Sequence, residues 1–285
     1  MVCRLCETEQ RLIKAHIIPE GFFRVLRDGS GALEVHTNKR GAHPRRAPIG
    51  VYDRSILCRP CDNVFSPWDK HAQDVMLRDF SDETAIYHGP MKLGWTISKF
   101  DYRQLKLFFL SLLWRASVST HDFYRRVSTG PFEQSLRKMI AAGEPGPPET
   151  FAVTLARFRE PAYTAMLDPH ADRYHGVNYF RFYLAGFVAY IKVDGRPPQG
   201  PLAHFTLRDD APITVLLRSA RDSKDAAVMR DIAVLRGGGS MAVNAAVELT
   251  VGYVYARRIS PRALNRDDSS RMARPSSLAH CTEAA

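Results

Sequence analysis

The sequence lacks the features of a membrane or secreted protein. No apolar run reaches the ~18 residues that a membrane-spanning helix needs. The two most apolar stretches, 107–114 and 183–191, have the length of core segments. Near the N-terminus, Arg4, Glu7 and Glu9 occupy the place where a signal peptide would need an apolar segment. We therefore expect a soluble, cytoplasmic protein with no membrane partner.

Cysteine is scarce, with only five among 285 residues, and disulfides are rare in the cytoplasm. Four of the five nevertheless form two CxxC pairs of identical spacing. Two intervening residues let both sulfurs reach one ion from a tight turn, and two such turns complete the tetrahedral four-sulfur site that zinc favours. We predict a structural zinc site at the N-terminus. Its ligands are Cys3, Cys6, Cys58 and Cys61.

Two other interpretations of these cysteines remain open. They could be unrelated free thiols, or one pair could be a redox motif. Redox pairs usually open a helix after a strand, and neither pair is predicted to have that setting. The fifth cysteine, Cys281, lies alone and is assigned no role.

Positive charge exceeds negative charge, giving a formal net charge of +10 and a pI of about 9.5. This balance favours a polyanionic partner such as nucleic acid, although a merely basic enzyme would look the same. The densest basic cluster near the cysteine pairs is the loop 36–46. We expect it to contact phosphates; the alternative is a solvated surface loop. The four expected contact residues are Lys39, Arg40, Arg45 and Arg46.

Hydrophobic periodicity predicts an α+β fold, with helices followed by a mainly antiparallel β-sheet. Residues 101–121 are apolar on most of the helix surface, which indicates a central core helix. Arg115 interrupts that apolar surface and must reach water or a partner. Two further helices are expected over 68–80, opening at Pro67, and over 131–142. The expected strands are 151–157, 163–167, 179–184, 187–193, 203–207 and 213–217.

These patterns suggest three parts. Residues 1–80 form the zinc-binding module, and 81–236 form an α+β domain that ends in a helix over 221–236. Residues 237–285 begin with Gly237-Gly238-Gly239-Ser240 and are expected to be a linker and a disordered basic tail.

Two stretches near the cysteines resemble the HNH endonuclease superfamily, specifically its ββα-metal or treble-clef members with a structural zinc. They are His16-Ile17-Ile18-Pro19 and the segment from Asp53 to Cys61. The resemblance covers about the first quarter of the chain. It implies an HNH-like ββα module and a metal-dependent endonuclease that hydrolyses DNA, in a setting such as bacterial defence or a mobile element. The implied cofactors are structural Zn²⁺ and catalytic Mg²⁺ or Mn²⁺, and the implied partner is DNA rather than RNA.

The resemblance also implies residue roles. His16 takes the place of the general base, Asp53 that of the residue orienting its imidazole, and Asp62 that of a ligand to the catalytic ion. The residue before the motif histidine usually binds this ion, but here it is Ala15. Substitute ligands would have to come from Asp62, Asp69 or His71.

Two other functions remain open. One is a non-catalytic, zinc-dependent nucleic-acid-binding protein, and the other is a protein-interaction scaffold in which zinc only folds the N-terminus.

Overall fold

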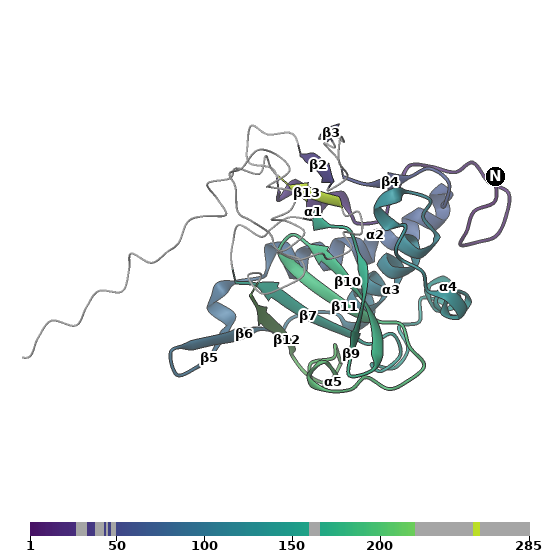
Figure 1. The fold of residues 1–285 in the computed structure, drawn as a ribbon. Helices are drawn as coiled ribbons and strands as arrows, with labels where there is room; N and C mark the ends of the chain where they lie inside the picture. Colours follow the sequence, from purple (N-terminus) through teal and green to yellow (C-terminus); the bar gives the residue numbers. More distant parts are fainter. Residues whose placement is uncertain are drawn as a thin grey trace, which may run out of the picture.

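The protein has a mixed α+β fold built on a mostly antiparallel sheet (Figure 1). The computed structural model describes residues 1–26, 33–37, 43, 45–46, 50–159, 166–219 and 253–256. Its main sheet has seven strands in the order β5-β6-β12-β7-β11-β10-β9. All neighbours are antiparallel except β12 and β7, which are parallel. The strands are β5 (Ala85–His88), β6 (Met91–Ile97), β7 (Val153–Phe158), β9 (His170–Tyr174), β10 (Val177–Leu184), β11 (Phe187–Lys192) and β12 (Ile213–Arg218).

Helix α3 (Tyr102–Val118) is the centre of the fold. It begins where the Asp101 carboxylate accepts a hydrogen bond from the backbone N–H of Gln104 (2.8 Å), which is an N-cap. Its residues from Leu105 to Ala116 are all buried, so the expected core helix is confirmed. One cluster of buried side chains extends from Cys3 to Val215, and it joins the N-terminal segment, α3 and the sheet.

Helix α2 (Arg59–Gln73) starts earlier than the pattern predicted. Pro67 does not open it but lies inside it, and a π-helical turn, Asp74–Arg78, continues it. An internal proline removes one backbone hydrogen bond. Burial of Phe65 and Trp68 on either side of Pro67 compensates for that loss.

The remaining helices are short, and they test the other predictions. The helix expected over 131–142 is confirmed. A 3-10 turn over Gly130–Phe132 leads directly into α4, which spans Glu133–Ala142. The strand expected over 203–207 is wrong, because Pro201 opens a helical turn there, where its missing N–H costs nothing. The elements are α1 (Glu20–Arg24), α4 (Glu133–Ala142), α5 (Pro201–His204), and the 3-10 turns Asp82–Thr84, Asp122–Tyr124 and Gly130–Phe132.

Two small sheets complete the described part of the chain. A ribbon pairs β1 (Ala15–His16) with β4 (Tyr52–Asp53). A four-stranded sheet has the order β3-β2-β13-β8. The second half of β2 and all of β3 therefore lie in the segment 36–46 that was expected to be a loop, and β13 lies in the segment expected to be a linker and tail. The strands are β2 (Glu34–Thr37), β3 (Arg45–Arg46), β8 (Met166–Leu167) and β13 (Tyr253–Ala256).

Some expectations fall outside these residues or stay untested. The helix expected over 221–236 lies outside the described residues. The boundaries at residues 80 and 236 stay predictions. Among the helices that the structure describes, none is long and apolar enough to cross a membrane.

One residue of α3 is a lysine that lies in the core. The side chain of Lys106 is fully buried, and its Nζ donates hydrogen bonds to the carbonyl oxygens of Phe151 (3.0 Å) and Pro148 (3.3 Å). Burial lowers the pKa of Lys106 to about 7, because the core disfavours its charged form.

Lys106 should make stability depend on pH. The folded protein gives up this proton near pH 7, whereas the unfolded chain keeps it to about pH 10.4. Unfolding therefore takes up a proton between these values, so the free energy of unfolding should rise with pH there, by up to about 1.4 kcal/mol per unit. Lys106→Met should lose this part of the slope in urea unfolding, whereas the exposed control Lys138→Met should keep it. Equal slopes in both variants would contradict the assignment.

Candidate metal centre and histidine site

The four cysteine sulfurs of the two CxxC pairs converge on one point. All four lie within 4.8 Å of one another, and the Sγ atoms of Cys6 and Cys58 are 3.9 Å apart. A tetrahedral zinc site with Zn–S bonds of about 2.3 Å has sulfur–sulfur edges of about 3.8 Å. The cluster can therefore hold a metal ion such as zinc, and its donor set of four sulfurs fits that ion.

Backbone hydrogen bonds shape the first cysteine turn and dock it on the second. The N–H of Cys3 donates to the carbonyl of Thr8 (3.0 Å), and Glu7, with a φ of 57°, closes the turn by donating to the carbonyl of Cys3 (2.9 Å). The N–H of Arg4 donates to the carbonyl of Ile56 (2.8 Å), just before the second pair. Two segments about fifty residues apart are thus held in register.

The second pair is carried by the start of α2. Cys58 is the N-cap residue, and Cys61 lies in the first turn. This pair follows β4 and opens a helix, contrary to the expectation used against a redox role. The argument against a redox role is instead that the first pair lies directly against the second. The N–H of Cys58 donates to Sγ of Cys3 (3.4 Å), and all four of these cysteines are free.

The environment of the sulfurs is uneven. A hydrogen bond from Thr8 lowers the pKa of Cys6 to about 6. Burial raises the pKa of Cys58 and of Cys61. A metal ion binds thiolates and must displace the remaining protons, so its affinity should rise with pH.

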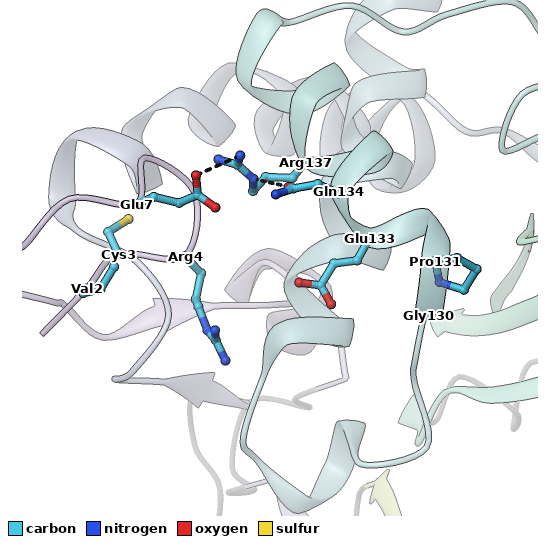
Figure 2. A pocket seen from close by; sticks show the side chains of 9 residues that line it. All are labelled: Val2, Cys3, Arg4, Glu7, Gly130, Pro131, Glu133, Gln134 and Arg137. Atoms are coloured by element: carbon cyan, nitrogen blue, oxygen red, sulfur yellow. Dashed lines mark hydrogen bonds and ion pairs between the residues drawn. The ribbon is translucent and has the colours of Figure 1, made fainter.

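Helix α4 holds the first cysteine turn from outside (Figure 2). The Arg137 guanidinium donates to the carbonyl of Leu5 (2.7 Å) and pairs with Glu7 (2.9 Å). A pocket lies between this turn and the start of α4, with Arg4 and Glu133 among the side chains that line it. The first cysteine pair is therefore anchored to the larger part of the fold.

His16 lies where β1 passes α2. Its charge acts on the carboxylates of Asp62 and Asp69, which are seven residues apart on α2 and so share one helix face. Asp62 is partly buried, and burial raises its pKa. Within the described residues, the Asp62 carboxylate accepts no hydrogen bond.

Arg115 connects Asp69 on α2 to the backbone of His16 on β1. Its buried guanidinium pairs with both carboxylate oxygens of Asp69 (2.7 and 3.0 Å) and also donates to the carbonyl of His16 (3.0 Å). Arg115 thus finds the partner that its position in the sequence required. Burial raises the pKa of Asp69, and the charge and hydrogen bonds of Arg115 oppose that shift.

Asp53 lies on the other face of the ribbon from His16. It pairs with Ala15, whereas His16 pairs with Tyr52, so the side chains of Asp53 and His16 point in opposite directions. Both Asp53 oxygens are engaged, accepting from Ser55 N–H and Oγ (2.8 and 2.6 Å) and from Ser119 Oγ, Thr120 N–H and Thr120 Oγ1 (2.8, 2.8 and 3.1 Å). The structure does not bring Asp53 to His16, and its carboxylate instead ties β4 to the end of α3.

The other candidate residues are scattered. His71 accepts a hydrogen bond at Nε2 from the N–H of Asp101 (2.9 Å), so it joins α2 to the N-cap of α3. Arg45 and the exposed Arg46 lie on β3. Lys39 and Arg40 lie outside the described residues. Four cysteines are the one group of three or more His, Cys, Asp or Glu residues close enough to hold a metal ion in the described part of the chain.

No protein-family model matches this chain, and neither the curated proteins nor the solved structures include a significant match. The geometry described above is therefore the basis for any functional proposal.

Purified protein should carry about one zinc ion per chain. Cys58→Ser should abolish zinc binding and unfold the N-terminal segment, since small metal-bound segments draw much of their folding free energy from the ion. Cys281→Ser is the matched control and should retain the metal. Elemental analysis and circular dichroism measure both effects, and well-folded wild-type protein without zinc would contradict the prediction.

Asp53→Ala should destabilise the protein without loss of zinc. The substitution leaves donors of Ser55, Ser119 and Thr120 without their acceptor, at a cost of about 2–3 kcal/mol in the free energy of unfolding. Burial opposes ionisation of Asp53, but the hydrogen bonds outweigh it and lower its pKa. The stabilisation is therefore full above the ordinary Asp pKa of about 3.9 and is lost as the pH falls below it.

The exposed Asp79→Ala is the control for this experiment, and chemical unfolding at neutral and acidic pH is the measurement. If Asp53→Ala unfolds like the control at neutral pH, the assigned role is wrong.

Proposed function

We propose that this protein is a metal-dependent endonuclease that hydrolyses DNA phosphodiester bonds, with His16 as the general base. The observation that carries the proposal is that His16 lies within electrostatic reach of Asp62, a partly exposed carboxylate that accepts no hydrogen bond within the described residues. An imidazole beside such a carboxylate can take a proton from water near neutral pH, because its positive form is stabilised there.

The resemblance to HNH endonucleases supports the same function. Its implied order of strand, strand and helix corresponds to β1, β4 and α2, with His16 on the first strand and Asp62 on the helix. The four-cysteine cluster lies at the junction of these elements, where a structural zinc ion would hold them together.

The proposed chemistry assigns one task to each residue. His16 takes the proton as the water oxygen attacks phosphorus, and the bond to the leaving sugar oxygen breaks, that oxygen taking a proton from solvent. Asp62 stabilises the imidazolium that forms. Arg115 donates to the backbone carbonyl of His16 and pairs with Asp69, so it positions the base without touching substrate.

A catalytic divalent ion finds a partial donor set. Asp69 is occupied by Arg115, and the methyl side chain of Ala15 has no donor atom, so neither offers a ligand. Asp62 remains, and Mg²⁺ is commonly held by one or two carboxylates together with water and substrate phosphates. Asp62 would hold the ion with the substrate's help, and the ion would supply charge neutralisation at the phosphate.

The same two observations favour a second candidate, a non-catalytic nucleic-acid-binding protein. With no donor atom on Ala15 and with Asp69 paired, this site offers fewer metal ligands than the resemblance implies. Such a protein would bind DNA at the surface around His16 without cutting it.

His16→Ala should reduce metal-dependent cleavage by about 10²- to 10⁴-fold, the usual contribution of a positioned base. Zinc content should be unchanged, since His16 is not one of the four cysteine ligands. The matched control is His88→Ala, an exposed histidine on β5. Nicking of supercoiled plasmid across a Mg²⁺ and Mn²⁺ titration measures all three proteins.

The outcomes separate the two candidates. Cleavage by wild type that persists in His16→Ala would exclude His16 as the base. Binding of DNA by wild type without cleavage of any DNA or RNA would favour the non-catalytic candidate.

A further inference from the structure

The β1–β4 ribbon has two chemically different faces. Ala15 and Asp53 form a cross-strand pair on the inner face, and both are buried. His16 and Tyr52 form the pair on the outer face, with their rings 6.1 Å apart in an edge-on arrangement. Lys14, just before β1, and Arg54, just after β4, both lie over the Tyr52 ring and so belong to this outer face.

Two cations are held on the aromatic ring at the centre of this face. Nζ of Lys14 lies 3.8 Å from the centroid of the Tyr52 ring, and the Arg54 guanidinium carbon lies 5.7 Å from it. Both basic side chains are exposed, and within the described residues neither forms an ion pair. Their charges are thus oriented by the ring yet not neutralised by the protein.

Lys14 and Arg54 both lie next to the ribbon that carries His16. Lys14 directly precedes β1 and is two residues from His16. Arg54 directly follows β4 and is two residues from Tyr52, which pairs with His16 across the ribbon. A long cationic side chain from each side of the ribbon therefore lies over the ring that is paired with His16.

We propose that Lys14 and Arg54, held on Tyr52, bind backbone phosphates of the nucleic-acid strand that reaches His16. The proposal rests on the proposed function and adds the surface that positions its substrate. The contacts go to the phosphate backbone and so fix the position of the strand rather than read its sequence. This surface differs from the loop 36–46 that the sequence suggested.

Binding of a labelled DNA duplex tests the proposal without cleavage. The His16→Ala protein is used without added divalent ion, and fluorescence anisotropy gives the dissociation constant over a salt titration. Lys14→Ala/Arg54→Ala is compared with Lys99→Ala/Lys138→Ala, which removes the same charge from two exposed lysines elsewhere.

The slope of log affinity against log salt is negative, and loss of two phosphate contacts should make it shallower by about 1.8. At ~50 mM salt this corresponds to roughly a hundredfold weaker binding, on any duplex sequence alike. The control pair should keep the parent slope, and the charge-conserving Lys14→Arg/Arg54→Lys should restore it.

Three outcomes would count against the proposal. If the parent binds DNA but both double variants have equal slopes, this surface is wrong and the proposed function stands. If Lys14→Arg/Arg54→Lys also loses the slope, the effect is structural and the proposal is wrong. If wild type neither binds nor cleaves DNA or RNA, the surface and the proposed function fail together.

Discussion

The convergence of four sulfurs is the constraint on which the N-terminal part of the fold depends. It joins residues 3–6 to residues 58–61, and the ribbon of β1 and β4 that lies between them in sequence has two residues per strand. So short a ribbon has little stability of its own in water. The cysteine cluster at the start of α2 therefore fixes where β1 and β4 meet that helix, and with them the position of His16.

A buried charge supplies the second constraint. Arg115 is buried on α3 among mostly apolar side chains, and removing its charge from water would be costly without partners. Asp69 neutralises it, and the carbonyl of His16 takes one of its remaining donors. One guanidinium thus ties α3 to α2 and β1. Asp53 does the same on the opposite face of the ribbon by joining β4 to the end of α3.

The cysteine spacing and the core helix were predictable because each rests on a local pattern. CxxC pairs bring sulfurs together whatever the rest of the chain does, and the apolar stretch in α3 has one stable environment. Helix α2 was misplaced because Pro67 usually opens a helix, and only the tertiary packing of Phe65 and Trp68 shows that it does not. The hairpin of β5 and β6 was not predicted, although Met91, Leu93, Trp95 and Ile97 alternate with polar residues or glycine as they do in a strand.

The histidine site was only partly predictable for a related reason. The resemblance assigned roles to His16, Asp53 and Asp62, and Asp69 and His71 were offered as substitute ligands because they are near in sequence; Arg115 was flagged as a charge in need of a partner. The sequence could not show which face of the ribbon each side chain takes. The alternation that separates Asp53 from His16 is visible only once the register of β1 and β4 is known, and the contacts of Lys14 and Arg54 with the Tyr52 ring need the structure as well.

The central claim is that the four cysteines hold a zinc ion that organises this part of the chain. X-ray absorption at the zinc edge, on protein as purified, tests it most directly. The account predicts four sulfur ligands at about 2.3 Å and no nitrogen or oxygen ligand. A zinc ion with mixed ligands, or folded protein whose Cys3 and Cys6 are joined in a disulfide, would contradict it.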